Sequence, residues 1–215
     1  MYIPKHFALA ETAACHQVIV DNSFGELVTL DDAGLPFASH LPFLVDPARG
    51  PSGTLLAHMA RANPQWQHFT NGKPALAMFH GPHAYISPAW YATHPAVPTW
   101  NYIAVHAYGV ARIIDAPAAV EGILRRLVDA NEAANGTTWH MGGLTEQYLG
   151  SMMRAIVAFE IPIDRLEGKA KLSQNRDAAD QAKVVEALAA SNDPSAQATS
   201  RAMRTRDSIP EWVGQ

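Results

Sequence analysis

The sequence has almost no cysteine, since Cys15 is the single thiol among 215 residues. One cysteine cannot form a disulfide within the chain, and no basic and then apolar segment of the secretory type precedes it. No apolar run approaches the roughly 20 residues that a membrane-spanning helix needs. These absences predict a globular protein that works in a reducing compartment, the cytoplasm.

The chain also lacks an excess of positive charge. Its 16 Lys and Arg residues are outnumbered by 20 Asp and Glu residues, which gives a net charge of -4. This is the wrong sign for strong non-specific binding to nucleic acid. Neither an internal repeat nor a helix-turn-helix pattern stands out, so any contact with DNA would need a local basic patch.

What the chain does contain is hydrophobic residues, at 48% of its composition, divided by prolines and glycines into short segments. That spacing is typical of antiparallel strands, and Gly34 in the turn Asp31-Asp32-Ala33-Gly34 favours a hairpin. The predicted strands are residues 27–30, 35–45, 54–59, 75–79, 102–115 and 156–161. Helical spacing of apolar residues predicts helices over residues 11–20, 117–134, 145–154 and 177–190. The expected fold is mainly β with peripheral α-helices, as a barrel or sandwich.

The division of the chain follows from its composition. Residues 1–190 are expected to form a single domain with flanking helices. Residues 191–215 are rich in Ser, Asn, Asp, Ala, Gln and Thr, which bury too little apolar area to fold alone. They are predicted to be a polar and flexible tail, in which Ile209 and Trp212 could dock.

The stretch GTLLAHMARANPQWQHF, residues 53–69, carries the densest group of polar donors. His58, Arg61 and Asn63 offer imidazole, guanidinium and amide groups, a mixture suited to a phosphate ester. Pro64 ends the preceding element because a proline pushes the residue before it out of the α region. The alternative is a plain strand end with a surface arginine and a capping asparagine.

The stretch PFASHLPF, residues 36–43, has two prolines in a strand-like run, which predicts an edge with free backbone groups. Such an edge can bind a flat heterocycle such as an isoalloxazine, with Ser39, His40, Leu41 and Pro42 beside it. A plain edge strand is the alternative.

Other clusters permit two interpretations each. His80 and His83 flank Gly81-Pro82, which we interpret as a tight turn, and no metal is assigned because no carboxylate or cysteine lies at matching spacing. An aromatic-rich segment is expected either to stack on a ligand or interface or to pack in the core, and it contains Trp90, Tyr91, Trp100 and Tyr102. A later polar cluster is expected either to bind an anion at a helix N-terminus or to cap that helix, and it comprises Lys169, Lys171, Ser173, Gln174, Asn175 and Arg176.

Taken together, several blocks in one order resemble the PaiB family. They cover most of the chain up to about residue 188 and read MYIPKHF (1–7), ASHLPFLVD (38–46), AHMARANPQW (57–66), HGPHAYISPAWY (80–91), PTWNYIAVHAYG (98–109) and LEGKAKLSQNR (166–176). The resemblance implies an FMN-binding split β-barrel of the pyridoxamine-phosphate-oxidase kind, normally a homodimer. It also implies a negative transcriptional regulator, associated in bacilli with sporulation and protease synthesis genes.

The resemblance further implies a set of cofactor-binding residues. The AHMARAN block resembles the segment that holds the flavin phosphate and ribityl chain, through His58, Ala60, Arg61 and Asn63. Ser39, His40, Leu41 and Pro42 resemble the strand beside the isoalloxazine. Lys171, Ser173 and Gln174 of the KLSQN block are expected to reach the cofactor of either subunit.

Three functions therefore remain open. The first is an FMN-binding regulator that acts on DNA directly or through a partner protein. The second is a flavin-dependent oxidoreductase for a small molecule, in which FMN carries the redox chemistry and no catalytic residue can be named. The third is a haem-binding protein, since ten histidines offer candidate iron ligands.

Overall fold

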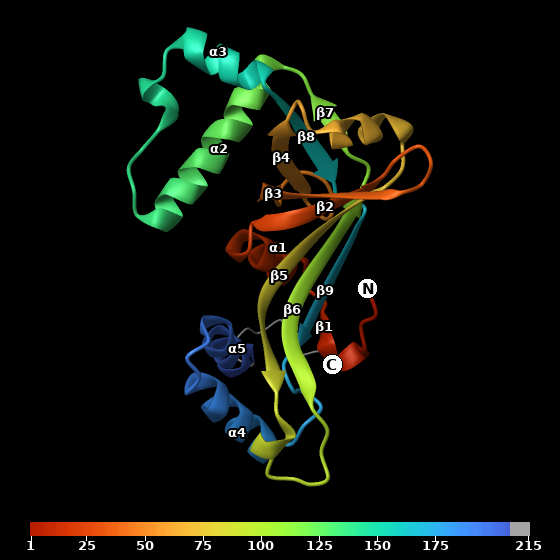
Figure 1. Cartoon of the computed structure of the whole chain (residues 1–215), viewed down its shortest axis with the longest axis vertical. Coiled ribbons are helices and arrows are strands. Elements are labelled where there is room, and N and C mark those ends of the chain that lie inside the picture. Colours follow the sequence, from red (N-terminus) through yellow and green to blue (C-terminus); the bar gives the residue numbers. More distant parts are fainter. Residues whose placement is uncertain (207–215) are drawn as a thin grey trace. The chain divides into compact units, whose positions relative to one another are not determined.

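The computed structural model describes residues 1–206, within which the strands form one antiparallel sheet in the order β1-β9-β6-β5-β2-β3-β4-β8-β7 (Figure 1). The strands are β1 (Ala8–Leu9), β2 (Phe24–Leu30), β3 (Pro36–Asp46), β4 (Thr54–Ala60), β5 (Ala75–Ile86), β6 (Thr99–Gly109), β7 (Arg112–Ile114), β8 (Ile156–Pro162) and β9 (Arg165–Lys171). The α-helices are α1 (Thr12–Asp21), α2 (Pro117–Asn135), α3 (Glu146–Arg154), α4 (Ala178–Ala189) and α5 (Pro194–Thr205). Short 3-10 helices are η1 (Lys5–Phe7), η2 (Pro64–Asn71), η3 (Pro88–Trp90) and η4 (Met141–Gly143). No helix in this part of the chain is both long enough and apolar enough to cross a membrane.

The chain folds into two compact units that alternate along the sequence. The first unit contains Met1–Asn22, Phe79–His106 and the described residues from Glu167 to Arg206. The second unit contains Ser23–Met78 and Ala107–Leu166. Since no single point in the sequence separates them, the division into one domain over residues 1–190 stays a prediction.

The β2–β3 hairpin in the second unit is confirmed. Leu27 pairs with Ser39, and Leu30 pairs with Pro36 next to the turn. Gly34 has a φ of 85°, which a side chain would disfavour, and the Asp31 carboxylate accepts a hydrogen bond from the Leu35 backbone at 2.8 Å. The turn chemistry thus sets the register of the two strands.

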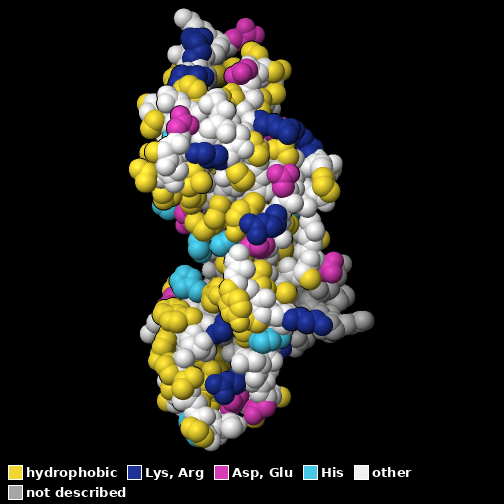
Figure 2. Space-filling view, turned by 90° about the vertical axis from the view of Figure 1, so that its right-hand side faces the viewer, with side chains coloured by type: hydrophobic (Ala, Val, Ile, Leu, Met, Phe, Trp, Pro, Cys, Tyr) yellow, Lys and Arg dark blue, Asp and Glu magenta, His cyan; other side chains and the backbone are white. Residues whose placement is uncertain are grey.

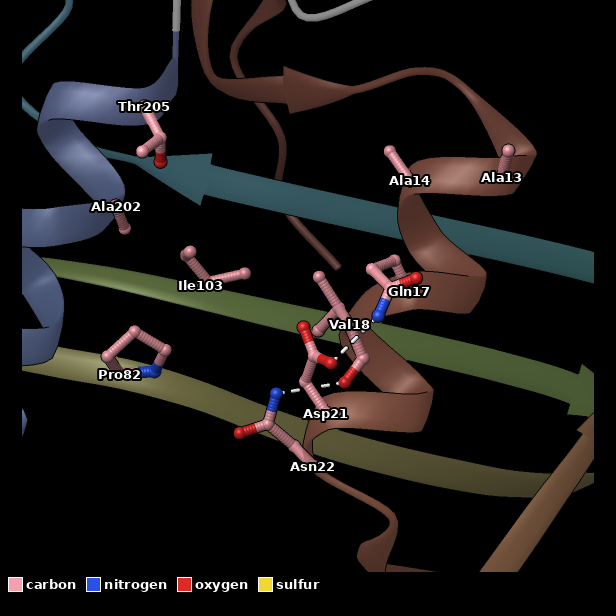
Figure 3. Close-up of a pocket in the computed structure, with 10 residues that line it drawn as sticks. All are labelled: Ala13, Ala14, Gln17, Val18, Asp21, Asn22, Pro82, Ile103, Ala202 and Thr205. Carbon is pink, nitrogen blue, oxygen red and sulfur yellow. Dashed lines mark hydrogen bonds between the residues drawn. The ribbon is translucent and has the colours of Figure 1, made fainter. Parts of the chain in front are cut away.

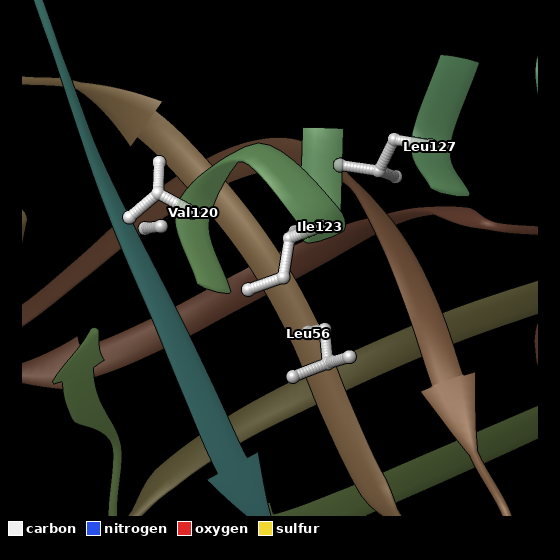
Figure 4. Packing of buried hydrophobic residues seen from close by; sticks show 5 residues of the cluster. Leu56, Val120, Ile123 and Leu127 are labelled. Carbon is white, nitrogen blue, oxygen red and sulfur yellow. The ribbon is translucent and has the colours of Figure 1, made fainter. Parts of the chain in front are cut away.

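Strand β4 is buried on both faces, and its two faces have different partners. Ala57 pairs with Phe43 on β3 and with Phe159 on β8, so its face packs against buried aromatic rings. On the opposite face, Leu56 and Ala158 pack with Val120, Ile123 and Leu127 of α2 (Figure 4). The helical spacing that predicted α2 is therefore the stripe with which α2 covers the sheet.

Helix α2 also begins and ends where its sequence indicates. Pro117 occupies the first turn, where the missing N–H costs nothing, and Gly136 follows the helix with a φ of 66°. The predicted helices over residues 11–20, 145–154 and 177–190 are likewise confirmed as α1, α3 and α4.

The prediction of a flexible tail from residue 191 is wrong for residues 194–205, which form α5 in the first unit. The Asp193 side chain caps the helix by accepting a hydrogen bond from Ser195 N, and Pro194 lies in its first turn. The buried side chains of α5 are small or flexible, and Ser200 donates to Val185 O of α4 at 2.8 Å. Composition hid this helix because Ala, Ser and Thr can pack closely against a neighbour without forming an apolar stripe. Ile209 and Trp212 lie outside the described residues.

Other boundaries also differ from the prediction. His80 to His83 lie inside β5, so Gly81-Pro82 is not a tight turn. The segment predicted as one strand over residues 102–115 is divided into β6 and β7. Strand β9, which the apolar pattern missed, carries two lysines and a glycine.

Candidate functional site

Three of the predicted cofactor residues, His58, Arg61 and Asn63, lie at or just beyond the end of β4, and Asn63 bonds to a fourth, Ser39. We call these four residues the β4-end site. His58 lies opposite Ala158 in the sheet, so its side chain lies on the face that α2 covers. Its Nδ1 atom is buried and has no hydrogen-bond partner among the described residues. Burial lowers the pKa of His58 below its usual value of 6.5, so the imidazole is neutral at pH 7. A neutral ring with an unpaired nitrogen can still accept or donate one hydrogen bond.

Asn63 connects two elements at this site. Its Oδ1 atom accepts a hydrogen bond from Gln65 N at 3.0 Å and so caps η2. Its Nδ2 atom donates to Ser39 Oγ on β3 at 2.8 Å. The expected capping asparagine is confirmed, and the same side chain fixes the predicted isoalloxazine strand beside β4.

Arg61 is exposed and is held by backbone carbonyls. Its Nε donates to Arg154 O at 2.8 Å and its Nη2 donates to Ile156 O at 2.7 Å. These carbonyls end α3 and start β8, where a cation interacts favourably with the negative end of the helix dipole. Two of the five N–H groups of the guanidinium are used in this way, and three stay available to an anion.

A cavity of about 370 Å³ adjoins Arg61, and we call it the arginine cavity. Arg154 also lines it, and Asp115 is its only carboxylate among the described residues. Most of the remaining lining is apolar and comes from β7, β8 and the facing sides of α2 and α3: Ile113, Ile114, Val120, Met153, Ile156, Val157 and Ala158. The volume lies in the range of small-molecule sites, and two arginines at an apolar cavity favour an anionic ligand with an apolar part.

The first turn of α2 adds to this preference. Pro117 and Val120 line the arginine cavity, and the N-cap residue Ala116 has no side chain that could cap the helix. The partial positive charge of a helix N-terminus favours an anion. Sequence analysis missed Arg154 and this helix end, because the pairing of β4 with β8 that brings them to Arg61 is not local in sequence.

The predicted isoalloxazine strand has one unpaired edge. Residues 36–42 of β3 pair with β2, whereas β4 pairs only with residues 43–46. Gln65 of η2 covers part of the open side by donating to Phe37 O at 3.0 Å. Leu41 is buried, Ser39 and Pro42 are half-buried, and the His40 side chain is 65% exposed with Glu26 3.7 Å from its Nδ1. The free edge expected from the two prolines is thus present. At the end of β4, Ala60 is exposed.

The predicted site residues of the KLSQN block lie in the first unit, where they bond to their own surroundings. Lys171 donates to Thr99 Oγ1 and to the backbone oxygen of Trp100. Ser173 is buried with a φ of 65°, and its hydroxyl accepts from Asn101 Nδ2 at 2.9 Å. The amide of Gln174 bonds to Leu172 N and Ala170 O. Burial, and then the charges of Lys169 and Arg176, lower the pKa of Lys171.

The aromatic segment was expected either to pack in the core or to stack on a ligand or interface, and its members differ in this respect. Tyr91 is buried, with the Arg176 guanidinium 4.2 Å above its ring, whereas Trp100 is 54% exposed and contacts Tyr85 and His83.

Within residues 1–206 no three His, Cys, Asp or Glu side chains are grouped as a metal site would require. On the face shown in Figure 2, Lys and Arg side chains are scattered and form no concentrated basic patch.

Comparison with known proteins adds to this geometry. The family described as "Putative FMN-binding domain" matches residues 1–165. A Bacillus subtilis protein named Protease synthase and sporulation protein PAI 2 is 35% identical over 207 residues, which cover 96% of this chain and 98% of that protein. An uncharacterised protein of Emericella nidulans is 30% identical over 223 residues, covering 86% of this chain and 89% of its own length.

A solved structure supports the fold. The FAD and haem binding protein from Mycobacterium smegmatis superposes with a TM-score of 0.57 at 18% identity, covering 80% of this chain and 77% of that one. Together with the observed antiparallel sheet and its flanking helices, this likeness supports the predicted fold class of strands with peripheral α-helices.

Proposed function

This chain belongs to the FMN-binding domain family, and on that premise we propose that it is a cytoplasmic flavoprotein that binds FMN at the β4-end site. The observation that carries the proposal is the placement of Arg61 and Arg154 at one apolar cavity, beside the uncapped first turn of α2. Two guanidinium groups and a helix N-terminus suit a phosphate monoester dianion. The carboxylate of Asp115 lines the same cavity and repels an anion, but Arg61 and Arg154 together carry more positive charge than Asp115 carries negative charge.

The residues present fit the cofactor. Arg61 keeps free N–H groups for the phosphate, and His58 has a buried nitrogen without a partner. The free edge of β3 at Ser39 to Pro42 offers backbone donors and acceptors for a planar ring, with Asn63 holding Ser39 in place. Bound FMN would supply reversible one- and two-electron redox chemistry, while the chain binds and orients it.

His58 has a defined part in this proposal. Its neutral imidazole sits on the face covered by α2 and has one nitrogen without a hydrogen-bond partner. A neutral ring can donate to a ligand oxygen or accept from a ligand hydroxyl, whereas an imidazolium can only donate. We assign His58 to ligand binding and not to charge neutralisation.

The biological role that we propose is negative regulation of gene expression by a homodimer. The support is the Bacillus subtilis relative, whose name refers to protease synthesis and sporulation. The net charge of -4 and the scattered basic side chains oppose direct operator binding, so the regulation is proposed to work through a partner protein. A gel-shift assay with genomic fragments across a salt series tests this point. A sequence-specific shift by the protein alone would overturn the indirect route.

A flavin-dependent oxidoreductase is the second candidate, and the unpaired nitrogen of His58 favours it because such a group can exchange a proton with a reacting ligand. The assay is anaerobic bleaching of protein-bound flavin by NADH, NADPH or reduced deazaflavin. Bleaching by one of them, with slower turnover in His58→Gln, supports the enzyme. Bound flavin that none of the three reduces argues for the regulator.

The experiment that tests FMN binding is an absorption spectrum of the purified untagged protein after dialysis, with and without added FMN. We expect visible flavin bands that stay with the protein in gel filtration, at one FMN per chain. The absence of both retained flavin and any spectral shift on titration would contradict the proposal. A Soret band on titration with haem would instead support the haem-binding alternative.

A further inference from the structure

We propose that a groove in the first unit, between α1 and α5, is a binding site for a small primary amine with an apolar body. The groove has a volume of about 440 Å³, within the range of small-molecule sites. Figure 3 shows its walls: α1 on one side, α5 with Ala202 and Thr205 on the other, and Pro82 and Ile103 from β5 and β6 between them. Nothing in the FMN proposal uses these residues.

The body of the groove is apolar. Val18, Pro82, Ile103 and Ala202 present only carbon atoms from their side chains, and Ala13 and Ala14 continue this surface along α1. Val18 is buried, and Ile103 is 7% exposed. An alkyl or aryl group that covers this surface gains about 25 cal/mol for each square ångström of apolar area removed from water.

The polar end of the groove carries one charge, the carboxylate of Asp21. Asp21 is the last residue of α1, Gln17 lies one turn before it and Asn22 follows the helix (Figure 3). One side-chain N–H group of each amide bonds locally, from Gln17 Nε2 to Asp21 Oδ1 at 2.8 Å and from Asn22 Nδ2 to Val18 O at 2.9 Å. The second N–H group and the oxygen of each amide leave both a donor and an acceptor, whereas the Asp21 carboxylate only accepts. An ammonium group only donates, so it pairs with that carboxylate.

The electrostatics of α1 also favour a cation. Asp21 is the last residue of the helix, where the helix dipole is negative and a carboxylate is unfavourable. The last turn of α1 contains no basic residue, and within residues 1–206 Asp21 forms no ion pair. A bound ammonium group would neutralise both the carboxylate and the helix end. An anionic ligand is excluded by the same charges.

The test is calorimetric titration of the full-length protein with 2-phenylethylamine, and with 2-phenylethanol as its uncharged counterpart. We expect saturable binding of the amine, about tenfold or more tighter than that of the alcohol, since hydrogen bonds to charged groups are the stronger ones. Ammonium chloride, which lacks the apolar body, is expected to show no saturable binding. Equal affinity for amine and alcohol, or no binding of either, would overturn the proposal.

Substitutions at Asp21 and at Ala202 test the polar end and the apolar surface of the groove separately. Asp21→Asn should reduce amine affinity to that of the alcohol and leave alcohol binding unchanged, whereas Asp32→Asn, which removes the same charge in the β2–β3 turn, should change neither. Ala202→Leu fills the groove and should abolish binding of both compounds, with Ala14→Leu as a second filling variant if the first fails to fold. Circular dichroism confirms that each variant is folded. Unchanged amine affinity in Asp21→Asn would contradict the assignment.

Discussion

The end of β4 and the end of β9 both carry several polar residues, but the two ends differ in how many of their hydrogen-bonding groups are already paired. At the β4 end, His58 keeps a buried nitrogen without a partner and Arg61 keeps N–H groups beside a cavity. At the β9 end, Lys171, Ser173 and Gln174 bond to Thr99, Asn101 and the local backbone. Polar density alone therefore does not identify a site. Unused hydrogen-bonding capacity beside a cavity is the more informative feature.

Replacing Arg61 at the β4 end or Lys171 at the β9 end by alanine should give the largest difference in FMN affinity between two variants. Arg61→Ala is expected to raise the Kd for FMN by about 10- to 100-fold, since a hydrogen bond to a charged group contributes about 1.5–3 kcal/mol. Lys171→Ala should leave that Kd within about twofold, because its ammonium already serves Thr99 and Trp100. Quenching of flavin fluorescence on titration measures both constants. An equal loss of FMN affinity in the two variants would contradict the assignment of FMN binding to the β4 end alone.

Ser173→Ala should affect stability and not FMN binding. The substitution leaves the buried Asn101 amide without its hydroxyl partner, which costs about 1–3 kcal/mol. Urea unfolding followed by circular dichroism measures the free energy of unfolding, with the exposed Ser151→Ala as a control. A weakened FMN complex in a fully folded Ser173→Ala protein would show that the β9 end takes part in binding.

Asn63→Ala should lower stability by about 1 kcal/mol, because η2 loses its cap and β3 loses the hydrogen bond to Ser39. A few-fold rise in the Kd for FMN is expected as well, because Ser39 on β3 is then held less firmly beside β4. Asn63→Asp keeps the capping oxygen, and its second carboxylate oxygen accepts from the Ser39 hydroxyl in place of the lost N–H donor. It should therefore recover most of the stability, while its FMN affinity stays reduced because a negative charge is added two residues from Arg61. An FMN affinity equal to that of the wild type would contradict this placement of the phosphate.

His58 should produce the smallest effect, a pH dependence of stability. Its pKa in the folded state lies below the usual 6.5, so the unfolded chain binds the proton more readily. The wild-type protein should keep its full stability above about pH 6.5 and lose part of it as the pH falls towards the folded-state pKa. Thermal unfolding of wild type and His58→Gln between about pH 7.5 and about pH 5, on either side of the usual histidine pKa, measures the difference. Parallel curves would mean that His58 is not the titrating group.

Local chemistry in the sequence predicts many of these features. Gly34 and Asp31 indicate the hairpin, and Pro117, Gly136 and the apolar stripe indicate α2, because these signals act within a few residues. The sequence also places polar groups correctly at the end of β4. Arg154 could not be assigned to this site, since it arrives through the pairing of β4 with β8, about 95 residues apart.

Where the prediction failed, packing between small residues decided the structure. Helix α5 has no large apolar stripe, yet Ala196, Thr199 and Ser200 are buried. Strand β9 carries Gly168, whose hydrogen occupies a place where a Cβ atom would lie 2.8 Å from Leu9. Helix α5 keeps helical spacing, since its buried residues Ala196, Thr199, Ser200 and Met203 recur on one face, but its apolar content is low. A search for apolar residues detects neither case, because close approach of backbones depends on residue size and not on apolarity.

The most direct test of the central claim is a thermodynamic cycle with FMN and riboflavin on wild type and Arg61→Ala. The two ligands differ only in the phosphate, so the cycle isolates the coupling between Arg61 and that group. We expect wild type to bind FMN about 10- to 100-fold more tightly than riboflavin, and Arg61→Ala to lose most of this preference while its riboflavin affinity stays similar. An undiminished preference for FMN in Arg61→Ala would contradict the assignment of the phosphate to the β4-end site.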